Sequence, residues 1–426
     1  MLKNVDRLLR DIPIPKMFRV RQSFPRPMIA PEDIPAEVAQ QLSEAGLTEL
    51  IRPGMQIAIT AGSRGIANIP VITKAIVDVV KERQAHPFIV PAMGSHGGAT
   101  AEGQAAMLKG LGISEETMGC PVCSSMEVVS LGLSDDGKEA VIDRYAMEAD
   151  GIIVSCRVKP HNSFRYRYES GILKMMAVGL GKQQGAAACH EDGVPSLPYH
   201  VESTAKVILN KAPILFAVAV IENAYDETAR IVAVPKDEIL ETEPALLEEA
   251  KRNMPAILVG EADVLVIDEI GKNYSGSGTD PNITGTFSTD CASGGLKVQR
   301  TCMLDVSEVS HGNAFGTGLA NAITRRLFDK MDFDQMYPNC ITSTVLKTAC
   351  IPPVMDSDLR AIQLCIRTCC GIDREHPRIV RIPNSLHIEH IMLSEAYYDM
   401  VKGRDDMEIE SGLFDLEFDE NGTLLN

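Results

Sequence analysis

The feature that most constrains the fold is a regular alternation of short, continuously apolar runs with segments of helical periodicity. Five apolar runs predict strands: Gln56–Thr60, Pro87–Val90, Gly151–Ser155, Ile214–Ile221 and Asp263–Asp268. From Ile72 to Val80, apolar residues recur with the i, i+3, i+4, i+7 spacing of an amphipathic helix. Strands that are apolar throughout and separated by helices are typical of a parallel sheet covered on both faces. The pattern therefore predicts α/β architecture of a Rossmann-like kind.

The length of 426 residues predicts two or three domains. A helix-like segment, Pro244–Asn253, is followed by Pro255, and a new strand is expected at Asp263. We therefore expect an N-terminal domain of residues 1–258 and a C-terminal α/β domain of residues 259–426. The Gly- and Ser-rich stretch 270–286 is expected to be a loop that faces a cleft between the two domains, where we expect the active site.

Composition excludes several classes of protein. With 41 basic and 58 acidic side chains the net charge is −17, which argues against a nucleic-acid partner. There is no apolar run of about 18 residues, so a membrane span is not expected. The first residues lack the apolar core of a signal peptide, and the eleven cysteines include no double CxxC array. The spacing of Cys120 and Cys123 is zinc-like or redox-like, but buried thiols are favoured. We expect a cytoplasmic protein with free thiols.

Three polar loops follow predicted strands: Ala61–Gly65, Met93–Gly98 and Lys159–Ser163. Ligands of open α/β sheets collect at the carboxyl ends of strands, where glycines let backbone N–H groups approach an anion. None of the loops is a GxGxxG or GxxxxGK[ST] motif, so an ordinary dinucleotide or P-loop site is poorly supported. Tight strand-to-helix turns are the other interpretation. The second loop supplies four candidates for binding an anionic cofactor: Gly94, Ser95, Gly97 and Gly98.

The histidines and one lysine suggest a chemistry. His96 and His161 each follow a predicted strand, and His190 follows a run of small residues. A single histidine is more often structural, but a pair can act as acid and base, and one can bind nickel. Lys174 lies in an otherwise apolar segment, Gly171–Val178, where burial would make it nucleophilic enough to carry a covalent adduct. The surrounding stretch, 157–182, is basic, which indicates either a solvated face or a site for phosphate or carboxylate groups.

In their order and spacing, these residues resemble the nickel-dependent lactate racemase family. The resemblance covers most of the chain and is strongest between Arg64 and His190, and it includes the 16 positions that separate Lys174 from His190. It implies a nickel-pincer nucleotide (pyridinium-3,5-bisthiocarboxylic acid mononucleotide nickel) that Lys174 tethers covalently and whose nickel His190 binds. It also implies that His96 and His161 are paired acid–base groups and that Arg64 binds the substrate carboxylate. Lys272 is the candidate for a substrate lysine from the second domain.

The chain departs from the family pattern around the substrate. The loop between His161 and Lys174 is longer, the acidic residue expected before Arg64 is missing, and the chain has no Trp. The substrate is therefore left open beyond its class, and Arg165 and Arg167 are candidates for recognising a second anionic group. The resemblance implies racemisation or epimerisation of a 2-hydroxy acid by hydride transfer through a 2-keto acid, with cofactor-biosynthesis proteins as partners. The oligomeric state, including a homo-oligomer, is left open.

Two other interpretations remain open from the sequence. One is a nicotinamide-dependent dehydrogenase on a Rossmann-like fold, which the missing GxGxxG motif disfavours. The other is a non-catalytic homologue that binds a nucleotide or a metal. The presence of His96, His161, Lys174 and His190 together argues against a degenerate site.

Overall fold

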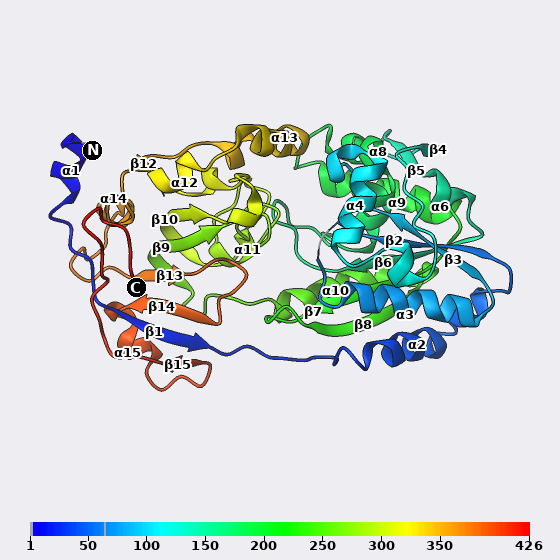
Figure 1. Ribbon diagram of the computed structural model, residues 1–426, viewed down its shortest axis with the longest axis horizontal. Coiled ribbons are helices and arrows are strands. Elements are labelled where there is room, and N and C mark those ends of the chain that lie inside the picture. The colour runs from blue at the N-terminus through cyan, green and yellow to red at the C-terminus, as the bar shows by residue number, and fades with distance from the viewer. Residues whose placement is uncertain (1–2, 64) are drawn as a thin grey trace. The chain divides into compact units, whose positions relative to one another are not determined.

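The computed structural model describes residues 3–63 and 65–426, which form two compact units (Figure 1). The N-terminal unit contains residues 25–161 and 165–254. The C-terminal unit contains the initial segment up to Phe24, the short segment Asn162–Phe164, and residues 255–426. This grouping differs from a division into residues 1–258 and 259–426, because two segments from the first part of the chain pack with the second unit.

The N-terminal unit is built on a five-stranded sheet with the order β3-β2-β6-β7-β8. Its strands are β2 (Gln56–Ala61), β3 (His86–Pro91), β6 (Gly151–Arg157), β7 (Ile214–Glu222) and β8 (Thr228–Pro235). Neighbouring strands are parallel except for β8, which is antiparallel to β7. Nearly every residue of β2, β6 and β7 is buried, as the apolar runs predicted for a sheet covered on both faces.

Helices cover this sheet. They are α2 (Ile34–Glu44), α3 (Ile69–Glu82), α4 (Ala101–Gly110), α5 (Glu115–Met118), α6 (Arg144–Glu148), α9 (Leu197–Lys211) and α10 (Ile239–Asn253). A hairpin of β4 (Val128–Leu133) and β5 (Glu139–Asp143) completes the unit, together with α7 (Ile172–Lys174), the π-helical η3 (Met175–Leu180) and α8 (Lys182–His190). The apolar face predicted for α3 is buried against β2 and β3.

Helix α10 begins at Ile239, five residues before the predicted Pro244. Proline lacks the N–H that would bind the carbonyl four residues earlier, which is that of Leu240. The Tyr168 hydroxyl donates a hydrogen bond to this carbonyl at 2.7 Å. A side chain distant in sequence thus replaces the missing partner, and local pattern alone could not reveal it.

The C-terminal unit is built on an eight-stranded sheet with the order β12-β11-β10-β9-β13-β14-β1-β15. Its strands are β1 (Met17–Gln22), β9 (Glu261–Ile270), β10 (Lys297–Val306), β11 (Ala322–Thr324), β12 (Val354–Met355), β13 (Ile379–Ile382), β14 (His390–Ser394) and β15 (Met407–Ile409). Strands β9 to β13 pair parallel with one another, whereas β14 is antiparallel to both β13 and β1, and β15 is antiparallel to β1. This pairing explains why the initial segment belongs to the C-terminal unit.

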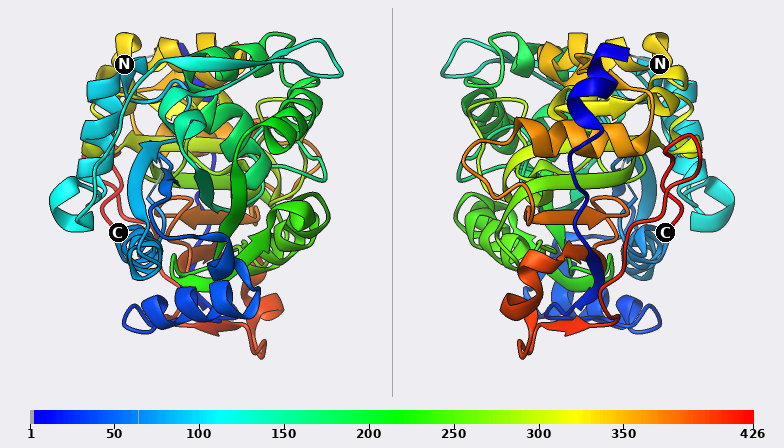
Figure 2. Two further views of the ribbon diagram at one scale, coloured as in Figure 1. Left: turned by 90° about the vertical axis from the view of Figure 1, so that its right-hand side faces the viewer. Right: turned by 90° about the vertical axis from the view of Figure 1, so that its left-hand side faces the viewer.

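The helices of this unit are α1 (Lys3–Leu9), α11 (Pro281–Thr284), α12 (Arg325–Asp329), α13 (Phe333–Ser343), α14 (Asp358–Thr368) and α15 (Tyr398–Val401). Helix α14 packs across β9 to β12, and α1 lies against α14 (Figure 2). Both sheets are parallel-rich and carry helices, so the α/β fold class predicted from the sequence is confirmed.

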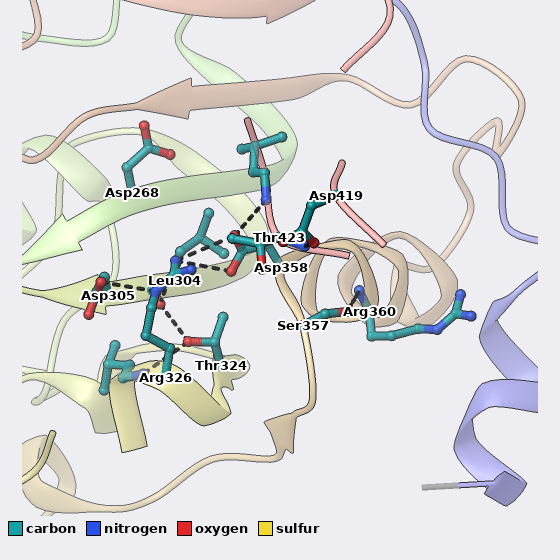
Figure 3. A network of polar contacts seen from close by, with 12 residues as sticks. Asp268, Leu304, Asp305, Thr324, Arg326, Ser357, Asp358, Arg360, Asp419 and Thr423 are labelled. Atoms are coloured by element: carbon teal, nitrogen blue, oxygen red, sulfur yellow. Dashed lines mark hydrogen bonds and ion pairs between the residues drawn. The ribbon is translucent and has the colours of Figure 1, made fainter. Parts of the chain in front are cut away.

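A polar network joins the carboxyl ends of the C-terminal unit's strands (Figure 3). Arg326 lies 2.9 Å from an oxygen of Asp305 and 3.2 Å from one of Asp358. The second oxygen of Asp358 accepts the backbone N–H of Leu424 at 2.9 Å. Because Asp358 is almost fully buried, these partners offset the cost of removing its charge from water, and they tie the last residues of the chain to the sheet.

Within the described residues, no helix is both long and apolar enough to cross a membrane. All eleven cysteines are free thiols. Burial raises the pKa of Cys120 to about 11 and also raises that of Cys123. Both remain protonated thiols near neutral pH, which agrees with the buried-thiol interpretation of the CxxC sequence.

We expect Phe18→Ala in β1 to lower the free energy of unfolding by about 3–5 kcal/mol, as for other buried aromatic residues. Phe18 is fully buried, and its ring meets that of Tyr398 edge-on with 5.2 Å between centroids. Urea unfolding followed by circular dichroism measures the loss. Leu8→Ala, at a residue 64% exposed, is the control and should change stability by less than about 0.5 kcal/mol. Equal effects of the two substitutions would contradict the role given to β1.

Candidate functional site

The three predicted loops follow the carboxyl ends of adjacent parallel strands in the N-terminal unit's sheet. Strand β2 lies between β3 and β6. The chain passes from β2 to β3 on one side and from β6 to β7 on the other, so the connections that leave β2 and β6 diverge. Such a topological switch point is where open α/β sheets bind ligands. The loops after β2, β3 and β6 carry Ser63, His96 and His161, respectively.

His96 is exposed, but its position is fixed by two neighbours. Its Nδ1 shares a hydrogen bond with the hydroxyl of Ser63, at the end of β2. The amide of Gln104, from α4, donates to the backbone carbonyls of Gly94 (2.9 Å) and His96 (3.2 Å). The buried amide of Gln104 therefore fixes the backbone of the loop, while the imidazole of His96 is exposed to solvent.

His161 is fixed through its backbone. Its N–H donates to Glu169 at 2.7 Å, and Arg165 donates to its carbonyl at 2.7 Å. Glu169 is buried and also lies 3.1 Å from the ammonium of Lys251. Burial and the positive charge of Lys174 hold the pKa of His161 well below its ordinary value. The imidazole is therefore neutral at physiological pH and is able to accept a proton.

Lys174 and His190 lie on one segment, at the end of α7 and of α8. The Nδ1 of His190 lies 2.7 Å from the carbonyl of Ala186 and must donate to it. The lone pair of the neutral ring is then on Nε2, which is the arrangement of a metal-binding histidine oriented by a backbone carbonyl. Burial and the charge of Lys174 also lower the pKa of His190. Because Lys174 influences both histidines, and His190 influences His161, the three side chains lie close enough to interact electrostatically.

Glu243 holds the start of the helix that carries Lys174. Its carboxylate accepts the backbone N–H of Leu173 at 3.0 Å and also that of Ile172. A Cβ on Gly171 would lie 2.4 Å from Glu243 Oε1, so only glycine permits this approach. Full burial of the carboxylate raises the pKa of Glu243 to about 7.

Backbone conformation and packing account for part of the glycine content of the His96 loop. The turn begins at Gly94, with Ser95 beside it, and Gly97 has a left-handed φ of 67°. A Cβ on Gly97 would lie 2.7 Å from the backbone of α4, whereas one on Gly98 would meet open space. Close packing on α4 therefore accounts for Gly97, and the binding of an anionic group by Gly94, Ser95, Gly97 and Gly98 stays a prediction.

Lys272 belongs to the C-terminal unit and follows β9, two residues after the strand ends. Strands β9 and β13 flank the topological switch point of this unit's own sheet, so Lys272 lies where this sheet would bind a ligand. Its ammonium donates to the carbonyl of Gly276 at 2.7 Å and lies 4.4 Å from the centre of the Phe315 ring. In the same unit, Asn162 donates to Ser275 (3.0 Å) and Ser277 (2.9 Å).

The other candidates differ in their surroundings. Arg165 contacts the His161 carbonyl and Glu169, and Arg167 pairs with Glu202. A second anionic group on the substrate would have to compete with these carboxylates. Arg64 lies outside the described residues. Among the described residues, there is no group of three or more His, Cys, Asp or Glu side chains able to hold a metal ion.

Sequence reasoning missed the groups that hold these side chains in place, among them Ser63, Gln104, Glu169 and Glu243. Gln104 and Glu243 are buried polar residues on helices, where a hydrophobic pattern places polar residues in solvent. Of these four residues, only Ser63 could have been found from local sequence, because it lies in the predicted loop after β2.

The fold and these side chains define an α/β protein with a candidate site, which contains histidines and a lysine, at the switch point of a mostly parallel sheet. Residues 12–196 match the family of lactate racemase N-terminal domains. This range is somewhat less than half of the chain and contains His96, His161, Lys174 and His190. This part of the chain is therefore related to the lactate racemase N-terminal domain.

Solved structures include a similar chain, the lactate racemase apoprotein from Thermoanaerobacterium thermosaccharolyticum. The two sequences are 15% identical, the match covers 77% of this chain and 81% of that chain, and the TM-score is 0.48. The search of curated proteins gave no match.

We expect Glu243→Gln to change how stability depends on pH. With a pKa of about 7 in the folded state and an ordinary value of 4.5, the folded protein holds a proton that the unfolded chain releases. This contribution is complete below pH 4.5 and is lost as pH rises through 7. Between pH 5 and 8, wild type should therefore lose about 2–3 kcal/mol relative to the variant in urea unfolding. A stability difference that does not change with pH would contradict the assignment.

Proposed function

We propose that this protein is a racemase or epimerase of a 2-hydroxy acid that works with a covalently tethered nickel-pincer nucleotide. The observation that carries the proposal is the electrostatic proximity of His161, Lys174 and His190 within the range that matches the lactate racemase N-terminal domain. The mutual electrostatic influence of these three residues, out of the series that resembles the racemases, supports the proposal.

The residues present fit this cofactor. Lys174 would form the tether from the end of α7, and His190 would bind nickel through Nε2, since Nδ1 is committed to Ala186. When bound, the cofactor would supply the hydride acceptor that makes inversion of the 2-carbon feasible. Lys159, whose positive charge also lowers the pKa of His161, would attract the nucleotide's phosphate. Cofactor-biosynthesis proteins are the partners this proposal requires, and the cytoplasmic location stays a prediction.

The remaining residues would bind and move protons. His161, neutral at physiological pH, would remove the hydroxyl proton of one enantiomer and return it, and His96 would do so for the other. Arg64 would hold the carboxylate with two hydrogen bonds, so that the planar keto acid turns without leaving. Lys272 stays the candidate for a further residue that binds the substrate. The substrate class is a 2-hydroxy acid, and its side chain stays undetermined.

We expect protein co-expressed with cofactor-making enzymes to show an adduct mass on the Lys174 peptide and close to one nickel per chain. Intact mass spectrometry, metal analysis and peptide mapping measure both. Lys174→Ala should lose the adduct, because the tether is gone, while Lys109→Ala on the exposed side of α4 should keep it. An unmodified chain without nickel, from a strain that loads a known racemase, would refute the proposal.

We expect His96→Ala and His161→Ala each to reduce turnover of the active 2-hydroxy acid by about 10²-fold or more, the usual size of general acid–base effects. The adduct on Lys174 should persist in both variants, because neither histidine holds the cofactor. Turnover is measured on each enantiomer with matched loading. Near-normal turnover in both variants would remove the histidine pair from the mechanism.

A further inference from the structure

A buried lysine lies between the two residues proposed to hold the cofactor. Lys182 is eight positions from Lys174 and eight from His190, at the point where η3 ends and α8 begins. Its side chain is fully buried, and its backbone φ of 54° is in the left-handed region that residues with a Cβ rarely adopt. Such a conformation persists only where the surroundings fix it. The contacts of its ammonium group hold Lys182 in place.

The ammonium of Lys182 lies 3.0 Å from a carboxylate oxygen of Asp143, which is equally buried at the end of β5. It also donates to the carbonyl of Pro91, the last residue of β3, and to the side-chain oxygen of Gln104 at 3.3 Å. Burial lowers the pKa of Lys182 and raises that of Asp143, and their mutual attraction opposes both shifts. A buried ion pair of this kind adds little net stability but fixes geometry, because few arrangements satisfy both charges.

Gln104 passes this constraint to the His96 loop. Its oxygen faces the Lys182 ammonium, so its amide nitrogen must face the carbonyls of Gly94 and His96. A flipped amide would place oxygen against these carbonyls and nitrogen against the ammonium, which neither side could accept. Lys182 therefore sets the orientation of Gln104, and Gln104 holds the loop on both sides of Ser95. Through Pro91 the same ammonium also holds the strand end from which the loop departs.

We propose that Lys182 and Gln104 are positioning residues that fix His96 relative to the segment carrying Lys174 and His190. The meaning of this link for catalysis rests on the proposed function. The contacts that form this link do not depend on the proposed function, because all of them join residues of one compact unit. In a reaction that needs a base at a set distance from a bound substrate, a displacement of about 1 Å can cost 10²-fold in rate.

The decisive variant is Gln104→Met, which conserves volume and leaves the Lys182–Asp143 pair in place but removes both hydrogen bonds to the loop. Its control is Gln184→Met on the exposed side of α8, where the amide contacts only the side chain of Glu139 among the described residues. Lys182→Met combined with Asp143→Asn is the second variant. It removes the ion pair without leaving a buried charge. The oxygen of the introduced amide can still accept the N–H of Ala146, which Asp143 accepts at 2.9 Å in wild type.

We expect Gln104→Met and the double variant to fold and to keep adduct and nickel at the wild-type level. Amide hydrogen exchange in residues 94–98 should be about 10-fold faster or more, and turnover should fall by about 10-fold or more with little change in KM. Gln184→Met should match wild type in each measurement. Exchange and turnover at the wild-type level in Gln104→Met would overturn the proposal, as would faster exchange with unchanged turnover.

The test also separates this inference from the proposed function. If wild type carries no cofactor, the proposed function fails, and the NMR signals of the His96 ring in wild type and Gln104→Met then decide the positioning role. A changed or broadened ring signal in Gln104→Met supports it, and an identical signal in the two proteins overturns it. Should either variant fail to fold, the other carries the same measurements.

Discussion

The site depends on one topological constraint: β3, β2 and β6 are adjacent parallel strands, so their carboxyl ends lie on the same side of the sheet. Because these strands are buried on both faces, they cannot slip in register without exposing apolar residues or burying loop polar groups. The loops that follow them are therefore brought together by the sheet and not by contacts among themselves. Ser63 and His96 share a hydrogen bond for this reason, although they follow different strands, and His161 lies on the loop that leaves the adjacent strand β6.

A layer of buried charged and amide groups gives this edge its finer geometry. Glu169 accepts the N–H of His161, Glu243 caps the helix of Lys174, and Lys182 orients Gln104 beneath His96. Each of these side chains acts on backbone and leaves the outward-facing groups to meet a ligand. The positive charge of Lys174 adds an electrostatic element, since it favours neutral imidazoles on both His161 and His190. Neutral rings are needed both to accept a proton and to bind a metal.

The sequence predicted what is encoded locally. The strands and α3 were found because their apolar periodicity is a local signal, and the loop residues were found because they follow those strands. The pairing of β1 with β14 was not predictable, since it joins positions about 370 residues apart. The burial of Glu243 and Lys182 was also not predictable, because a polar residue in a helical pattern is expected to face solvent unless its partner is known. The start of α10 was missed for the same reason, as Tyr168 replaces the hydrogen bond that Pro244 cannot make.

The central claim is that His190 and Lys174 together hold a nickel-containing cofactor at the carboxyl edge of the N-terminal sheet. The most direct test is nickel anomalous diffraction from crystals of protein co-expressed with cofactor-making enzymes. We predict one strong nickel peak within coordination distance of His190 Nε2, with electron density that continues to the side chain of Lys174. Nickel bound only at exposed histidines such as His376 or His390, with Lys174 unmodified, would contradict the account.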